Sequence, residues 1–240
     1  MEVKDSLLKL TVEFSRACSS FFPSGGNFYI YNPLDYAFGP YSDYIKKYAG
    51  TADNIFIGMN PGPVGMLQTG IPFGEIDSVK NWLGISGEVH QPLYVHPKRP
   101  VVGFDIKRRE PSGKRLWGFF KEEFGTPEKF FKNNFVYNYC PLGIFDEAGK
   151  NVTPDKLRKS ERDVLFSICD DFLRRHMEIL GTKRAVAIGN FAFERLAETV
   201  SRSGMDIECL KIIHPSPANP LANKGWAEAV RPVLEPVLLS

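Results

Sequence analysis

Short apolar runs alternate with amphipathic helical patterns along this sequence, and that alternation limits the fold more than any other feature. The runs are rich in β-branched and aromatic residues and stop at Asn, Gly or Pro, as buried strands do. They occupy residues 28–31, 55–59, 135–139, 185–188 and 210–213. Strands that are separated by helices predict a mostly parallel sheet with helices on both faces.

The helical patterns show apolar residues at helical spacing, bounded by capping residues, Gly or Pro. They are an N-terminal helical segment within residues 1–27, a helix at 115–124, a short helix opened by Thr126 and Pro127, a long helix within 154–181, a helix after residue 190 and a C-terminal helix from about residue 226. The N-terminal segment is expected to pack on the rest of the chain.

The length and composition fit a single domain. The chain has 240 residues, of which 43% are apolar, and no linker-like stretch divides it. We therefore predict one α/β domain over residues 1–240, built as a three-layer α/β/α sandwich with a mostly parallel central sheet.

Polar residues stand where several predicted strands end: Asn60, Asn138, Asn190 and His214. Ligands of parallel α/β sheets bind at this edge, so these side chains are expected to point into one shared crevice. Each has a structural alternative. Helix N-capping explains Asn190 better, and Asn60 or His214 alone would indicate a turn residue or a structural histidine. Their occurrence at separate strand ends favours a functional site.

The chemistry available at these strand ends is limited. No carboxylate accompanies Asn60, no serine lies in a G-x-S-x-G context, and the cysteines at 18, 140, 169 and 209 have no metal-site spacing. We expect free thiols in a reducing compartment, no metal and no cofactor. The remaining amides and imidazole are suited to holding a neutral polar ring, orienting water and stabilising a departing anion.

Basic residues are unevenly distributed, although the net charge is only +2. Residues 96–115 concentrate them and form a candidate phosphate-facing surface, for which a solvated loop is the alternative. The basic residues are Lys98, Arg99, Lys107, Arg108, Arg109, Lys114 and Arg115, against the acids Asp105 and Glu110. No signal peptide or apolar run of membrane-spanning length is present, so no membrane partner is expected.

Longer motifs carry a family resemblance. They are GMNPGPVGMLQTGIPFGEI at 58–76, HPKRP at 96–100, GKRLWGFF at 113–120, FVYNYCPL at 135–142 and HPSPANPLANKGW at 214–226. In this order, from about residue 28 to the C-terminus, they resemble the single-strand-selective monofunctional uracil-DNA glycosylases.

This resemblance implies a metal-free DNA repair enzyme with an α/β/α sandwich. Such an enzyme flips uracil out of single- or double-stranded DNA, hydrolyses the bond between uracil and deoxyribose, and leaves an abasic site. It further implies a monomer whose partner is uracil-containing DNA, with no obligate protein partner. The expected location is the nucleus in a eukaryote, or the cytoplasm with the nucleoid in a bacterium.

The resemblance also assigns roles to residues at matching motif positions. Asn60 resembles the residue that positions the attacking water, and His214 the one that hydrogen-bonds uracil O2 as negative charge builds on the base. Asn138 resembles the amide that reads the Watson–Crick edge of uracil, by donating to O4 and accepting from N3–H. Phe73 resembles the ring that stacks on the base.

Pocket-wall positions of the family match Met59 and Gly62. Because Gly62 has no side chain, it leaves room beside C5 of the pyrimidine. The family's acceptance of 5-hydroxymethyluracil is therefore expected here as well.

One departure concerns the residue that fills the gap left by a flipped base. Vertebrate members carry an arginine after H-P-S-P, whereas this chain has Ala218, which is too small for that role. The role then falls to Leu221 or Asn219, or is weaker, with a greater preference for single strands. The expected phosphate contacts are Lys98, Arg99 and Lys224.

Two other functions fit the same residues. One is a broader deaminated-base glycosylase that also removes xanthine or hypoxanthine. The other is a non-catalytic module that binds single strands or modified bases. The joint presence of Asn60 and His214 speaks against mere binding, because binding requires neither a water-positioning amide nor an anion stabiliser.

Overall fold

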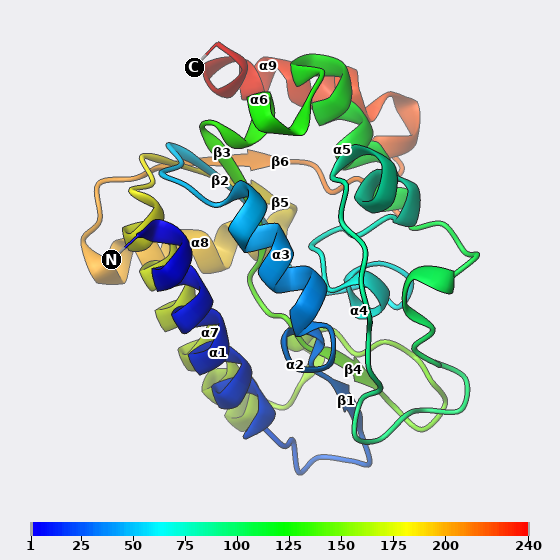
Figure 1. Cartoon of the computed structure of the whole chain (residues 1–240). Helices are drawn as coiled ribbons and strands as arrows, with labels where there is room; N and C mark the ends of the chain where they lie inside the picture. Colours follow the sequence, from blue (N-terminus) through cyan, green and yellow to red (C-terminus); the bar gives the residue numbers. More distant parts are fainter. Residues whose placement is uncertain (1, 240) are drawn as a thin grey trace.

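The computed structural model describes residues 2–239. Its centre is a four-stranded parallel sheet in the order β3-β2-β5-β6, with helices on both faces (Figure 1). The strands are β2 (Asn54–Gly58), β3 (Asn134–Asn138), β5 (Arg184–Ile188) and β6 (Glu208–Ile212). The α/β class and the parallel sheet predicted from the sequence are thereby confirmed.

The register of the sheet brings the strand ends to one edge. Gly58 pairs with Asn138, and Ile188 pairs with Ile212. Because all four strands run in the same direction, the residues that follow them emerge side by side. That edge carries the polar residues that the sequence places after strands.

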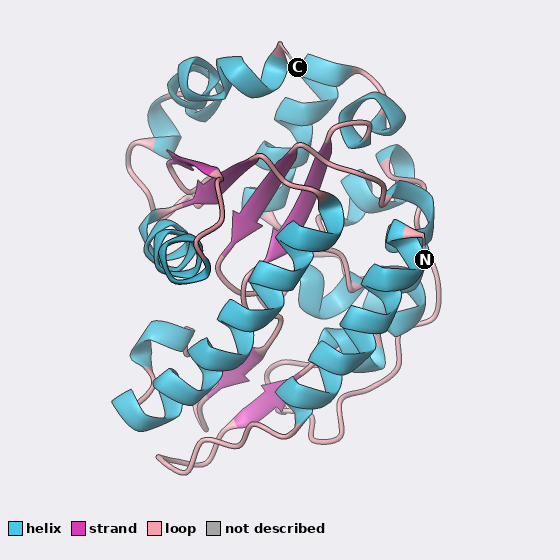
Figure 2. Cartoon of the chain, turned by 90° about the vertical axis from the view of Figure 1, so that its left-hand side faces the viewer, coloured by secondary structure: helices cyan, strands magenta, loops and turns pink. Residues whose placement is uncertain are grey.

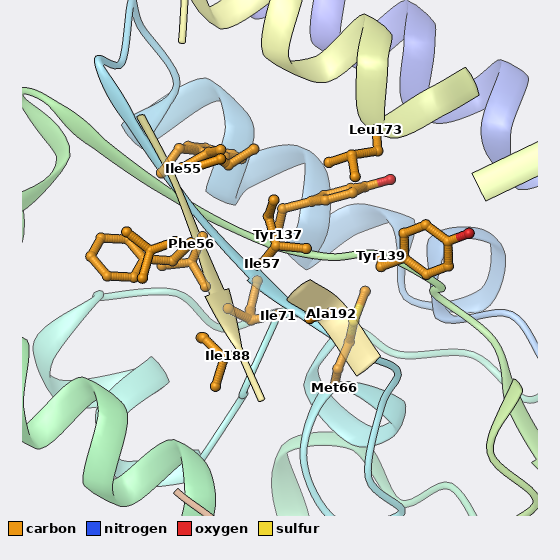
Figure 3. Close-up of a cluster of buried hydrophobic side chains, with 14 of the residues drawn as sticks. Ile55, Phe56, Ile57, Met66, Ile71, Tyr137, Tyr139, Leu173, Ile188 and Ala192 are labelled. Carbon is orange, nitrogen blue, oxygen red and sulfur yellow. The ribbon is translucent and has the colours of Figure 1, made fainter. Parts of the chain in front are cut away.

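One face of the sheet is covered by α1 (Val3–Ser19) and α7 (Lys159–Leu180), which pack against each other. The Tyr137 ring of β3 lies 4.1 Å from the ring of His176 of α7, which ties this layer to the sheet. Within the layer, Phe14 of α1 stacks on Phe172 of α7 at 4.4 Å. Figure 3 shows Tyr137 beside Leu173 of α7. The N-terminal helix is thus part of the core layer.

The opposite face is covered by α5 (Pro111–Phe124), α6 (Pro127–Phe131) and α9 (Trp226–Leu238). Phe56 of β2 meets Phe120 of α5 at 4.8 Å, and Phe119 meets Trp226 at 5.7 Å. The remaining helices are α2 (Pro33–Tyr36), α3 (Phe38–Tyr48), α4 (Met66–Thr69), α8 (Asn190–Ser203), a π-helical turn (Ser78–Trp82) and 3-10 turns at Gly103–Asp105, Pro154–Lys156 and Ala222–Lys224.

The first predicted strand lies outside the main sheet. β1 (Tyr29–Tyr31) pairs antiparallel with β4 (Gly143–Phe145), and Figure 2 shows this pair apart from the parallel strands. The sequence did not predict β4. The run at β1 ends at Asn32, whose side chain caps α2 and donates to the Ser15 carbonyl, so the chain turns away from the sheet.

The long helix predicted within 154–181 is α7, which begins at Lys159 after a 3-10 turn and an extended Leu157. One helix prediction needs correction, because N-capping by Asn190 was wrong. Gly189, with φ 95°, is the cap residue of α8, and Asn190 is its exposed first residue. The positive φ suits glycine and leaves no capping role for the amide.

None of the helices within residues 2–239 is both long and apolar enough to cross a membrane.

Candidate active site

A cavity of about 240 Å³ opens at the carboxyl edge of the parallel sheet. Sites for drug-sized ligands begin at about 300 Å³, so this one suits a single small ring. Its lining is Met59, Asn60, Pro61, Gly62, Gly65, Met66, Phe73, Glu110, Ser112, Asn138, Asn151, Thr153, His214 and Ser216. Asn60, Asn138 and His214 thus meet in one cavity as the sequence predicts, together with Met59, Gly62 and Phe73, whereas Asn190 is not part of it.

His214 follows β6, and its ring is held in a defined tautomer. The backbone N–H of Ser216 donates to His214 Nδ1 at 3.1 Å, so Nδ1 is unprotonated and the neutral ring carries its proton on Nε2. Burial lowers the pKa of His214 below its usual value, which favours this neutral form. The site therefore contains a neutral N–H donor at the end of a strand.

Asn60 follows β2 and faces the same cavity. Its Nδ2 donates to the carbonyl of Leu142 at 3.5 Å, a long hydrogen bond that orients the amide. Within residues 2–239, Asn60 Oδ1 accepts no hydrogen bond. This oxygen is available to a donor in the cavity, such as water.

Asn138 ends β3 next to Gly58, and this neighbour has to be glycine. The Asn138 side chain is 5% exposed, and its Nδ2 lies 3.3 Å from Met66 Sδ, a weak acceptor. A Cβ on Gly58 would overlap Asn138 Oδ1 and lie 2.7 Å from the Phe73 ring. Gly58 therefore lets the amide and the ring approach each other across the backbone of β2.

Phe73 adopts φ 52°, a left-handed conformation that is unusual for a bulky side chain. Its carbonyl accepts from Trp117 Nε1 at 3.1 Å and from the Glu75 N–H at 2.6 Å. Gly113 of α5 lies so close that a Cβ there would overlap this carbonyl. The turn is thus held by α5, and its ring lies 6.2 Å from the His214 ring as a fixed wall of the cavity.

Glu110 is a residue of the cavity wall that was not predicted from the sequence. Glu110 caps α5 by accepting from the backbone N–H groups of Ser112, at 3.1 Å, and Gly113. Burial raises the pKa of its carboxyl, while those two hydrogen bonds oppose the shift. An acid before Pro111, at a helix start, was the available signal. Asn151 and Thr153 were also missed, because N-V-T-P reads as an ordinary loop.

Lys98 and Arg99 lie outside the cavity and contact one turn. Lys98 Nζ is 3.4 Å from the Ala148 carbonyl, and Arg99 Nε donates to the Gly149 carbonyl at 2.6 Å. Lys98 is exposed, and Arg99 is half-buried. Of the two side chains, Arg99 therefore makes the closer hydrogen bond with the protein itself.

The loop after His214 is fastened to α5. Arg115 donates to the Pro215 carbonyl at 2.9 Å and to Asn223 Oδ1 at 2.8 Å. Within the loop, Asn219 Nδ2 donates to the His214 carbonyl at 3.2 Å, and its Oδ1 accepts from the Leu221 N–H at 3.1 Å. Both ends of the Asn219 amide thus make hydrogen bonds inside the loop.

Ala218, Leu221 and Lys224 are exposed on this loop. The Leu221 side chain is 59% exposed, which is unusual for a large apolar residue. Of the two residues considered for gap filling, only Leu221 presents a free side chain.

Among residues 2–239, no group of three or more His, Cys, Asp or Glu side chains could hold a metal ion. The cysteines are free thiols, and Cys18, Cys140 and Cys169 are buried.

Comparisons with known proteins show which family this chain resembles. Residues 45–232 match the family model of the uracil DNA glycosylase superfamily. A single-strand selective monofunctional uracil-DNA glycosylase of Rattus norvegicus is 44% identical over 207 residues, which are 86% of this chain and 74% of the relative. The protein of the same name from Bos taurus is 44% identical over 202 residues, covering 84% of this chain and 74% of the relative. The crystal structure of wild-type SMUG2 from Pedobacter heparinus superposes with a TM-score of 0.71 over all of both chains, at 16% identity.

Proposed function

Since this chain belongs to the single-strand selective monofunctional uracil-DNA glycosylases of the uracil DNA glycosylase superfamily, we propose that its cavity receives a uracil flipped out of DNA. The protein is a uracil-DNA glycosylase, a DNA repair hydrolase. One observation carries the assignment of the site: Asn60, Asn138, Phe73 and His214 converge in one cavity the size of a single ring.

Base recognition rests on Asn138 and Phe73. Asn138 Nδ2 donates to uracil O4 and Asn138 Oδ1 accepts from N3–H, a pairing that cytosine does not match. In the free protein Nδ2 has only the weak acceptor Met66 Sδ, so exchanging sulfur for O4 is favourable. Phe73 stacks on the base face, and its strained turn, fastened by Trp117, keeps the ring in place.

Cleavage rests on His214 and Asn60. As the C1′–N1 bond of the nucleotide breaks, negative charge builds on the uracil, and the His214 Nε2–H donates to O2. A preplaced donor of this kind is worth about 3 kcal/mol. Asn60 Oδ1 accepts from the water that attacks C1′, and the hydrogen bond to Leu142 keeps that oxygen oriented. The chemistry needs no metal, because the leaving base stabilises its own charge with this help.

The size of the pocket beside Gly62 supports acceptance of 5-hydroxymethyluracil. A Cβ built at Gly62 would have nothing within 4 Å, so this wall leaves space for a substituent. Met59 completes the same wall.

The DNA backbone is proposed to run past Lys98, Arg99 and Lys224, whose positive charges attract phosphate groups. The chain would act as a monomer, in the nucleus of a eukaryote or beside the nucleoid in the cytoplasm of a bacterium.

Leu221 is proposed to enter the gap that a flipped base leaves in a duplex. In Leu221→Ala, excision from double-stranded DNA is expected to fall about tenfold. Unstacking a base costs a few kcal/mol, and the apolar side chain that fills the gap offsets the part of that cost that corresponds to this factor. Excision from single strands should change little, because they have no stacked gap to fill. Single-turnover rates on both substrates measure this, and Val233→Ala, an exposed apolar residue of α9, is the control. Equal losses on both substrates would show that Leu221 does not fill the gap in the duplex.

Uracil excision is expected to survive chelation, because the proposed step uses only amides, an imidazole and water. The test incubates the protein with EDTA and oligonucleotides that carry one uracil, 5-hydroxymethyluracil, xanthine or hypoxanthine, and then applies alkali to reveal abasic sites. Activity that is lost with EDTA and restored by a divalent ion would contradict the mechanism. Cleavage at xanthine or hypoxanthine would indicate the broader glycosylase, and binding without any cleavage would indicate a binding module.

A further inference from the structure

Glu110 brings a carboxyl group to the wall of the cavity, and the proposed function gives it no role. The residue is partly buried and lines the cavity beside Ser112. One carboxyl oxygen accepts from the Ser112 N–H at 3.1 Å and the other from the Gly113 N–H, and the Ser112 hydroxyl also hydrogen-bonds the carboxyl. An ionised carboxylate has about four acceptor positions, so these donors do not use all of them.

The Glu110 side chain lies against the loop that faces C5 of the base in the proposed function. A Cβ on Gly65 would lie 2.9 Å from Glu110 Cγ, so a glycine is needed where the side chain passes. The Gly65 N–H donates to the Gly62 carbonyl at 3.3 Å and closes a turn, whose ends lie within about 7 Å of each other. Both glycines line the cavity, and the space beside Gly62 is open. A C5 substituent in that space would lie beside Glu110.

The charge of Glu110 is held by dipoles rather than by a cation. Burial raises the pKa of its carboxyl, but the N–H groups of Gly113 and Ser112 and the positive end of α5 favour the ionised form. In the part of the chain from 2 to 239, no Lys, Arg or His forms an ion pair with it. The carboxylate can therefore accept from a donor in the cavity and repel an anion there.

We propose that Glu110 sets the specificity of the cavity at C5 of the base. Its carboxylate accepts a hydrogen bond from the hydroxyl of 5-hydroxymethyluracil and repels the carboxylate of 5-carboxyuracil. This inference rests on the proposed function. A hydrogen bond to a charged group favours the hydroxymethyl group over an apolar group of the same size. Repulsion between like charges excludes the carboxyl group. Uracil has only hydrogen at C5 and experiences neither effect.

The first test compares C5 substituents on the wild-type protein. Identical oligonucleotides carry uracil, 5-hydroxymethyluracil, 5-ethyluracil or 5-carboxyuracil, and each single-turnover excision rate is divided by the rate on uracil. The ethyl group matches the hydroxymethyl group in size but has no hydroxyl. The relative rate is expected to be about 10- to 100-fold higher for hydroxymethyl than for ethyl, and lowest for carboxyl. A hydroxymethyl rate no higher than the ethyl rate would overturn the inference.

The second test is Glu110→Gln, which keeps the shape of the side chain and removes its charge. The rate on 5-hydroxymethyluracil relative to uracil should fall about 5- to 10-fold, and the relative rate on 5-carboxyuracil should rise at least about tenfold. Because each value is a ratio to uracil on the same protein, a general loosening of α5 cancels. Glu75→Gln is the matched control: Glu75 also accepts from a backbone N–H, that of Ser78 at 2.9 Å, but does not line the cavity. Both ratios should stay unchanged in it.

The outcomes separate this inference from the proposed function. Unchanged ratios in a Glu110→Gln variant that excises uracil would refute the role of Glu110 alone. If that variant does not excise uracil, Glu110→Asp decides, because its shorter side chain keeps the charge. It should still reject 5-carboxyuracil but distinguish hydroxymethyl less from ethyl, and acceptance of 5-carboxyuracil would refute the role. A wild-type protein that does not excise uracil would refute the proposed function itself.

Discussion

Replacing His214 or Asn60 with alanine is expected to slow single-turnover excision of uracil by about 100-fold or more in each case. The His214 Nε2–H and the Asn60 Oδ1 act mainly on charge and bonds that develop during the reaction, so their loss raises the barrier without weakening the substrate complex. A loss of about 3 kcal/mol in the transition state corresponds to roughly this factor.

The measurement is the single-turnover rate on a uracil oligonucleotide at saturating enzyme, with DNA affinity determined in parallel. Binding should change little in both variants. Asn190→Ala is the matched control, because Asn190 also follows a strand of the sheet but lies outside the cavity. Near-normal cleavage in both His214→Ala and Asn60→Ala would place the active site elsewhere.

Exchanging Asn138 for aspartate is expected to lower uracil excision by about 30- to 1000-fold. The side chain keeps its shape, but an ionised carboxylate only accepts hydrogen bonds, so it still meets N3–H and opposes O4 with a second acceptor. The lost donor and the repulsion between acceptors in a desolvated pocket together cost on the order of 2 to 4 kcal/mol.

Cytosine provides the discriminating comparison for Asn138→Asp. Its N4 amino group can donate to the carboxylate, so cytosine should lose less than uracil, although its unprotonated N3 also faces an acceptor. The assay compares single-turnover excision from identical oligonucleotides that carry uracil or cytosine, at equal enzyme excess. If the variant cleaves uracil at the wild-type rate, Asn138 is only a turn residue at the end of a strand.

Strands β2, β3 and β5 were predictable because they are almost wholly buried and are therefore nearly continuous apolar runs, whereas the edge strand β6 is only partly buried and was recognised from the apolar residues at its end. β4 was not, since Gly143–Phe145 is only a short segment after a proline and its partner strand is distant in sequence. The same reason explains the error about 28–31. That run has the composition of a sheet strand, but the Asn32 cap and the contact with Ser15 decide where it goes.

Some residues of the candidate site could likewise be predicted from the sequence, and others could not. Asn60, Asn138 and His214 were visible because polar residues at strand ends of a parallel sheet share an edge. Asn151 was not visible, because its position depends on a hairpin that local sequence does not specify. The left-handed turn at Phe73 is also a tertiary effect, since Trp117 and Gly113, some forty residues away, hold it in place.

Helix α5 anchors two walls of the site at once. Trp117 and Gly113 hold the turn of Phe73, and one turn of the same helix presents Arg115 to the loop that follows His214. A local opening of α5 would therefore release the stacking ring and the leaving-group donor in one cooperative event. Substitutions that loosen this helix should therefore impair uracil binding and bond cleavage together. Recognition and catalysis share the stability of a single helix.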